Sequence, residues 1–305
     1  MDKIIITTGD PNGIGAEITM KALKALNLPK EKIAIISNKK ILNYYGKLDK
    51  NYEIIEIPYN ENDIKVGQVT KEAGEFSFQS LKLACELKPK AIVTAPVAKN
   101  ALHLAGHNFN GQTEVLQHFL AHDNQLAEML FVANGFRVLL LTRHCALKEI
   151  TLTQDVVVTK IKNLVKTFQK QFSINNPKFA LCGFNPHSGE DGILGREEID
   201  ILIPAVQELQ NAGIDITMPL PADTLFVDAA KNYLKNTKDK YDCYIANYHD
   251  QGLIPIKTVA GENTVNMTIG LDIVRTSPGH GTAFDIADKN IASPNGMIAA
   301  IKEVL

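Results

Sequence analysis

Short runs of β-branched and aliphatic residues alternate along the chain with stretches of helical periodicity, and this alternation restricts the possible fold more than any other feature. Strands that alternate with helices build βαβ units, so the sequence predicts an α/β fold whose largely parallel sheet is covered by helices on both faces. The expected strands are Lys3–Thr8, Lys32–Ser37, Tyr52–Ile57, Ala91–Ala95, Val138–Thr142, Lys178–Phe184 and Tyr241–Tyr248. The expected helices are Gly15–Leu26, Glu72–Leu87, Thr153–Phe172 and Arg196–Ala212.

Two segments depart from this alternation. Between residues 128 and 142, two apolar runs flank Asn134-Gly135, a dipeptide typical of tight hairpin turns, so an antiparallel pair is expected there. Pro204 falls inside the last helical pattern, where it has no backbone N–H to donate and is expected to kink or split the helix.

The length of the chain favours two domains. A chain of 305 residues with 45% hydrophobic content lies in the range where one core tends to split. No repeat or Pro/Ser-rich linker marks a boundary, but the pattern changes near Gly106–Gly111. We therefore expect one α/β domain at 1–105 together with 255–305, a second at 106–254, and a cleft between the domains.

The charge balance and the cysteines limit the possible partners and surroundings. Lys plus Arg total 32 against 34 for Asp plus Glu, which leaves no basic surface for nucleic acid or an anionic membrane. The four cysteines form no C-x-x-C pair, and no apolar run approaches the roughly 20 residues of a membrane span. These features predict a cytoplasmic protein that acts on small molecules.

Three histidines follow predicted strands directly: His144, His187 and His249. In open α/β sheets, ligands bind beyond the carboxyl ends of the strands. One such histidine is most simply a loop residue, but three favour a metal site, and imidazole ligands suit zinc, cobalt, nickel or iron(II) better than magnesium. Asp250 fits two roles equally, a further ligand or partner of an imidazole, and a simple turn residue.

Other residues are less informative by themselves. The loop from Gly9 to Glu17 fails as a dinucleotide fingerprint, because Ile18 stands where G-x-G-x-x-G needs glycine, and it fails as a P-loop because no GK[ST] follows. A tight turn explains it. Lys257, Asn266 and Arg275 offer groups that bind anions, although scattered polar residues are ordinarily part of the surface.

Several long motifs together carry a family resemblance. The chain contains TTGDPNGIGAEI, TAPVAKNAL, GQTEVL, GFNPHSGEDGILGREEID, PLPADTLF, YHDQGLIPIK and VNMTIGLDIVRTSPGHGTAFDIA. In this order, from Thr7 to Ala287, they resemble the 4-hydroxythreonine-4-phosphate dehydrogenase family. The blocks cover nearly the whole chain and are far more specific than any single motif above.

The resemblance implies a two-domain α/β/α fold similar to isocitrate and isopropylmalate dehydrogenases, and a nicotinamide cofactor, NAD or NADP, bound without a Rossmann fingerprint. The implied reaction is oxidation of 4-phosphohydroxy-L-threonine to an amino-oxo acid that loses carbon dioxide and yields 3-amino-2-oxopropyl phosphate, in pyridoxal 5'-phosphate biosynthesis. A divalent metal ion, Zn, Co or Mg, would polarise the substrate oxygen, and histidine ligation favours Zn or Co.

Residue by residue, the resemblance assigns the metal ligands to His144, His187 and His249. The ligands of one metal would come from both subunits of a homodimer, with the second domain also carrying dimer contacts. The implied substrate-binding residues are Gln112, Thr113, Lys257, Asn266 and Arg275. Asp223, Asp250 and Lys99 would line the cleft as catalytic residues.

Gln112 departs from the family pattern, because many members have histidine at this position and read GHTE. Glutamine still donates a hydrogen bond, but it does not titrate near neutral pH. The resemblance therefore leaves open whether a proton is transferred here.

Two alternatives stay open. In the first, the chain is a dehydrogenase of the same scaffold that acts on another phosphorylated hydroxy acid, such as a threonate phosphate. The basic residues favour a phosphorylated substrate over a dihydrodiol carboxylate without phosphate. A non-catalytic metabolite-binding protein is the alternative of another class, and loss of the ligands or basic residues would favour it. None of them is lost.

Overall fold

The computed structural model describes residues 1–49, 51–122 and 125–305, which divide into two compact units. Unit 1 comprises Met1–Ala127 and Val265–Leu305, and unit 2 comprises Glu128–Thr264. These boundaries differ from the ones expected near residues 105 and 254. Helix α5 (Gln112–Leu120) belongs to unit 1 because it packs on α3 (Lys71–Glu86). Helix α9 (His249–Ala260) belongs to unit 2 because it packs on α8 (Ala222–Lys235) and on three strands of that unit.

The sheet of unit 1 confirms the first four predicted strands. Its order is β3-β2-β1-β4-β11-β10, and only β10 runs antiparallel to its neighbour. The strands are β1 (Ile4–Thr7), β2 (Ile33–Ser37), β3 (Glu53–Glu56), β4 (Ala91–Thr94), β10 (Val265–Ile269) and β11 (Val274–Pro278). Strands β1, β2 and β4 are buried throughout, as their continuous apolar runs require of parallel strands covered on both faces.

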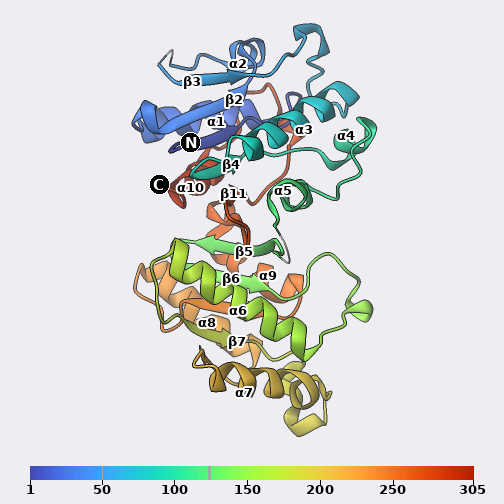
Figure 1. Ribbon diagram of the computed structural model, residues 1–305, viewed down its shortest axis with the longest axis vertical. Helices are drawn as coiled ribbons and strands as arrows, with labels where there is room; N and C mark the ends of the chain where they lie inside the picture. Colours follow the sequence, from blue (N-terminus) through green and yellow to red (C-terminus); the bar gives the residue numbers. More distant parts are fainter. Residues whose placement is uncertain (50, 123–124) are drawn as a thin grey trace. The chain divides into compact units, whose positions relative to one another are not determined.

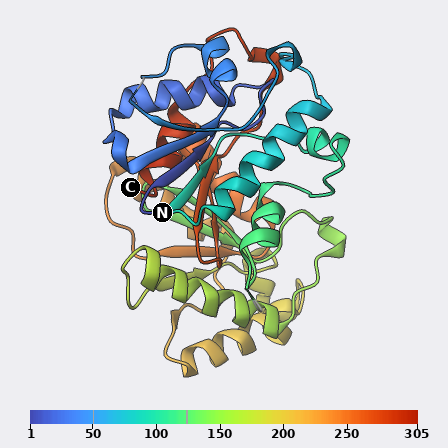
Figure 2. The same cartoon turned by 45° about the horizontal axis from the view of Figure 1, so that its top comes forward.

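Helices cover both faces of this sheet (Figure 1). On one face, α1 (Gly15–Leu26) and α10 (Asn295–Lys302) lie side by side and bury Ile4 and Ile6 (Figure 2). On the other face, α2 (Lys39–Tyr45), α3 and α5 cover Ile5 and the rest of a second apolar cluster. The short α4 (Lys99–Leu104) packs on α3.

The sheet of unit 2 has the order β5-β6-β9-β7-β8. Its strands are β5 (Glu128–Ala133), β6 (Phe136–Leu140), β7 (Lys178–Leu181), β8 (Asp215–Ile216) and β9 (Cys243–Ala246). All pairs are parallel except β5 with β6, so the predicted hairpin is confirmed. Its turn has positive φ at both Asn134 (42°) and Gly135 (87°), which only asparagine, aspartate and glycine adopt readily.

The helices of unit 2 are α6 (Gln154–Gln171), α7 (Ile203–Asn211), α8 (Ala222–Lys235) and α9. Pro204 lies in the first turn of α7, where its missing N–H costs nothing. A π-helical turn, Glu198–Leu202, leads directly into α7, so the helix expected over Arg196–Ala212 is not interrupted and only its hydrogen-bond pattern changes, from π to α, next to Pro204. No helix in the described ranges is both long and apolar enough to cross a bilayer.

Candidate functional site

The three strand-end histidines lie in unit 2, after adjacent parallel strands. His144 follows β6, His249 follows β9, and His187 follows β7. Because β9 pairs in parallel with both β6 and β7, all three strands end at the same edge of the sheet. This confirms that the histidines follow strand ends, the usual location of ligands in open α/β sheets.

His144 and His249 are close together. Their ring centroids are 5.4 Å apart, with an angle of 48° between the ring planes. His249 is the first residue of α9, and its Nδ1 contacts Asp250 Oδ1 at 2.7 Å. This contact holds the ring by one nitrogen and leaves Nε2 for a ligand, an arrangement typical of metal-binding histidines.

His187 belongs to a separate group. Its Nδ1 contacts Glu190 Oε1 at 2.5 Å, and its side chain is 64% exposed. The hydrogen bond and the charge of Glu190 raise the pKa of His187, and the charge of Asp223 adds to this effect. Asp223 lies in the first turn of α8, which packs against the segment 186–192.

The imidazole and carboxylate groups described above are typical metal ligands. The described residues of one chain do not bring enough of them together to hold a metal ion. Within residues 1–49, 51–122 and 125–305, no group of three His, Cys, Asp or Glu side chains is close enough to hold an ion. The structure brings together His144, His249 and Asp250, and it brings His187 near Asp223. It does not bring the three predicted imidazoles to one point.

Arg275 on β11 is a buried charged residue of unit 1, with only 2% exposure. Its Nε donates to Thr94 Oγ1 at 2.8 Å, and its Nη1 lies 3.4 Å from Thr268 Oγ1. Burial lowers the pKa of Arg275 to about 9, and the charge of Glu114 partly opposes this. No carboxylate of the described residues forms an ion pair with the guanidinium, so an anionic ligand would relieve an otherwise costly burial.

Two predicted substrate residues of unit 1 carry acceptors without partners. Gln112 opens α5 and donates from Nε2 to Ala95 O at 3.2 Å, while its Oε1 is buried without a hydrogen-bond partner. Asn266 Oδ1, on β10, is likewise buried and unpartnered. Buried polar atoms are nearly always satisfied, so each of these two acceptors has room for a hydrogen bond from a water molecule or a ligand. Thr113 is also buried.

The two predicted lysines are placed differently. Lys99 is the first residue of α4 and Lys257 lies on α9, and both are exposed. They belong to different units. Neither is buried in the way that Arg275 is.

Sequence analysis missed Asp10, in the loop between β1 and α1. The residue is fully buried, its Oδ1 accepts from Asn12 N at 2.9 Å, and its Oδ2 has no partner. Burial raises the pKa of Asp10 to about 6, although the backbone N–H groups of Asn12 and Ala98 oppose the shift. The available signal was an aspartate in the glycine-rich turn that follows the buried strand β1.

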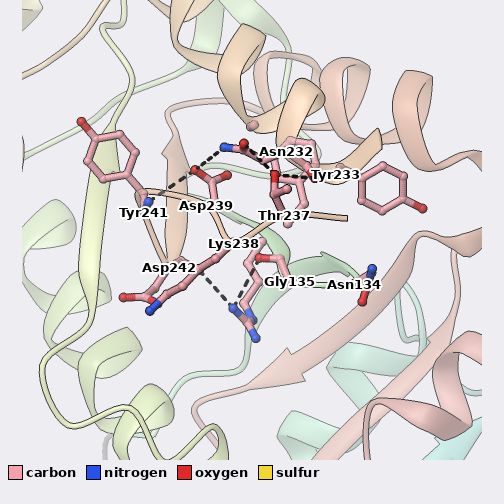
Figure 3. Close-up of a pocket in the computed structure, with 12 residues that line it drawn as sticks. Asn134, Gly135, Asn232, Tyr233, Thr237, Lys238, Asp239, Tyr241 and Asp242 are labelled. Carbon is pink, nitrogen blue, oxygen red and sulfur yellow. Dashed lines mark hydrogen bonds between the residues drawn. The ribbon is translucent and has the colours of Figure 1, made fainter. Parts of the chain in front are cut away.

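A cavity of about 190 Å³ lies at the opposite, amino-terminal ends of β6 and β9 (Figure 3). Most of its polar groups are already paired. Asp239 accepts from Tyr244 OH at 2.8 and 2.9 Å, and Asp242 Oδ2 accepts from Lys178 N at 2.8 Å. In each unit, the carboxyl-terminal edge of the sheet, with its unpartnered groups, is a better candidate for ligand binding than this cavity.

Comparison with protein families gives a match over nearly the whole chain. Residues 3–304 match the family described as pyridoxal phosphate biosynthetic protein PdxA. The chain belongs to this family.

Curated PdxA-family relatives match the chain over nearly its whole length. It is 39% identical to a 4-hydroxythreonine-4-phosphate dehydrogenase from Synechocystis, over 99% of this chain and 94% of the relative. It is 37% identical to a D-threonate 4-phosphate dehydrogenase from Salmonella typhimurium, over 98% of this chain and 97% of the relative. The family is therefore established, while its members act on more than one substrate.

Solved structures confirm the fold expected from the resemblance. The 4-hydroxythreonine-4-phosphate dehydrogenase of Klebsiella pneumoniae superposes with a TM-score of 0.85 at 32% identity, covering 100% of this chain and 98% of that one. Isocitrate dehydrogenase from Methylococcus capsulatus superposes with a TM-score of 0.51 at 14% identity, covering 99% and 85%. The PdxA-family chain thus shares the fold of the isocitrate dehydrogenase.

Asp10 leads to a stability prediction for this PdxA-family protein. Between its ordinary pKa of 3.8 and its folded value of about 6, the folded protein keeps a proton that the unfolded chain has lost. The free energy of unfolding therefore falls as pH rises through this window, by about 3 kcal/mol in total. Asp10→Asn should lack this loss and gain stability relative to wild type between pH 4 and 7. Urea unfolding of both proteins across this range tests it, and parallel pH curves would contradict it.

Proposed function

We propose that this chain is a metal-dependent, NAD(P)-linked dehydrogenase that converts 4-phosphohydroxy-L-threonine to 3-amino-2-oxopropyl phosphate and carbon dioxide, in pyridoxal 5'-phosphate biosynthesis. The observation that carries the proposal is the buried guanidinium of Arg275, which has no acidic partner among the described residues of this PdxA-family chain. Such a cation matches the phosphate that the proposed substrate carries.

In the proposed binding step, Arg275 binds the phosphate through the N–H groups that its threonine partners leave available. The family resemblance adds Lys257 as a further cation for the substrate. The unpartnered oxygens of Gln112 and Asn266 accept from the substrate amino and hydroxyl groups, and Thr113 adds a hydroxyl. These contacts fix the carbon that is oxidised.

The proposed chemical step uses the strand-end residues. His144, His187 and His249 would hold a divalent ion, preferably zinc or cobalt, which when bound supplies Lewis-acid polarisation of the substrate oxygen. A bound nicotinamide would supply the acceptor for the hydride. Asp250 fixes the tautomer of His249, Asp223 takes the hydroxyl proton, and Lys99 returns a proton to the carbon that loses carbon dioxide.

We also propose that the enzyme is a homodimer in which a partner subunit completes the metal site. Its support is that the described residues of one chain place His144 beside His249 but include no group of three donor side chains that could hold an ion. In this proposal, Gln112 positions the substrate through hydrogen bonds and transfers no proton, because a metal ion, when bound, would acidify the substrate hydroxyl.

The second candidate substrate is D-threonate 4-phosphate, and the 37% identity with the Salmonella typhimurium enzyme favours it specifically. The two substrates share the phosphate, but 4-phosphohydroxy-L-threonine has an amino group where D-threonate 4-phosphate has a hydroxyl. We expect the higher kcat/KM with 4-phosphohydroxy-L-threonine when NAD(P)H formation is followed with each. A higher value with D-threonate 4-phosphate would reverse the assignment, and no turnover of either would contradict a dehydrogenase of this class.

A further inference from the structure

The segment that carries His187 has an unusual backbone. Residues 187–191 all have positive φ, with values of 52°, 54°, 83°, 42° and 54° in chain order. Only one of the five, Gly189, is a glycine. Each of the others costs roughly 1–2 kcal/mol relative to a right-handed conformation. Such a segment persists only where its surroundings enforce it.

Hydrogen bonds inside the segment account for part of this enforcement. Ser188 N donates to Asn185 O at 3.1 Å, and Leu194 N donates to Gly189 O at 3.0 Å. Ile193 N donates to Glu190 O at 3.1 Å. These bonds close the turn, but they do not attach it to the rest of unit 2.

Glu198 makes that attachment. Its Oε1 accepts from Asn185 N at 2.8 Å, and its Oε2 accepts from Asn185 Nδ2 at 2.9 Å. The same Oε2 would lie 2.7 Å from a Cβ at Gly189, so only glycine allows this close approach. One carboxylate therefore touches the chain on both sides of His187, at residues 185 and 189.

Burial of the Glu198 carboxylate costs free energy. It is 2% exposed, and no lysine, arginine or histidine of the described residues pairs with it. A buried carboxylate without a cation is strongly unfavourable unless hydrogen bonds hold it. Glu198 also opens a π-helical turn, a rare element that is frequent at functional sites.

We propose that Glu198 is a positioning residue for His187, fixing through Asn185 and Gly189 the left-handed turn that presents the imidazole to the metal. This inference rests on the proposed metal role of His187. A glutamine in its place keeps the size, but its amide NH₂ would face the N–H donors of Asn185, so at least one of the two hydrogen bonds is lost.

The test compares Glu198→Gln with wild type and with Asp239→Asn. Asp239 is a matched control, because it is another loop-anchoring carboxylate of unit 2, at the far end of β9 (Figure 3). Co²⁺ titration of the apoprotein measures metal affinity through the absorbance of the bound ion. Hydrogen exchange of the Ser188, Ile193 and Leu194 amides measures the order of the turn without metal.

We expect Glu198→Gln to weaken Co²⁺ binding about 10- to 100-fold, as loss of a supporting residue typically does. The three amides should exchange at least about tenfold faster, because an opened turn exposes them. Asp239→Asn should leave both quantities unchanged. Wild-type affinity and exchange in Glu198→Gln would overturn the inference. If the wild type binds no Co²⁺, the metal proposal fails separately, and the exchange rates alone decide the role of Glu198.

Discussion

Replacing Arg275 with alanine is expected to raise KM for the phosphorylated substrate more than it lowers kcat. The phosphate lies away from the reacting carbon in the proposed complex, so its contact contributes equally to the ground state and the transition state. A charge-assisted contact is worth about 1.5–3 kcal/mol, which corresponds to about a tenfold to hundredfold loss in kcat/KM. Steady-state kinetics with varied substrate measures both constants.

Two further variants make this test specific. Arg275→Lys keeps the charge but not the forked donor geometry, so it should recover only part of the loss. Arg137→Ala is the control. Arg137 is a partly buried arginine of unit 2, and its guanidinium packs over the Phe172 ring at 4.5 Å. It should leave KM unchanged. A loss confined to kcat in Arg275→Ala would place this residue at the reacting carbon instead of the phosphate.

His187→Ala should remove turnover and lower the bound metal per chain while the protein stays folded. The side chain is 64% exposed and its one described contact is with Glu190, so its loss should affect stability little. Metal analysis of the purified variant, with circular dichroism as a check of folding, measures this.

His103→Ala and His118→Ala are the controls for this variant. Both residues lie on helices of unit 1, α4 and α5, whereas the three strand-end histidines belong to unit 2. Their metal content should equal that of wild type. Unchanged metal content in folded His187→Ala would remove this residue from the ligand set.

The elements that the sequence predicted well are those with a simple burial pattern. Strand β1 is apolar at almost every position because helices cover both of its faces, and the Asn134-Gly135 hairpin follows from the φ values that its turn needs. Strands β10 and β11 were not predicted. Their sequences are VNMTI and VRTSP, in which the polar residues, among them the proposed site residues Asn266 and Arg275, interrupt the apolar pattern.

Some residues of the candidate site could be predicted from the sequence and others could not, and the difference again depends on burial. Histidines after apolar strands can be recognised from the order of the sequence, and the parallel pairing of β6, β9 and β7 then aligns them. Burial of an arginine depends on contacts across the sheet, so Arg275 looked like an ordinary surface residue. Asp10 was missed because aspartate is common in turns, and only its burial distinguishes it.

The central claim, oxidation coupled to decarboxylation of a phosphorylated hydroxy acid, is tested most directly by the stoichiometry of the reaction. Carbon dioxide and NAD(P)H are measured together while 4-phosphohydroxy-L-threonine is consumed by the metal-loaded enzyme. The account predicts one molecule of each product for every substrate molecule. NAD(P)H without carbon dioxide, or no turnover by metal-loaded protein, would contradict it.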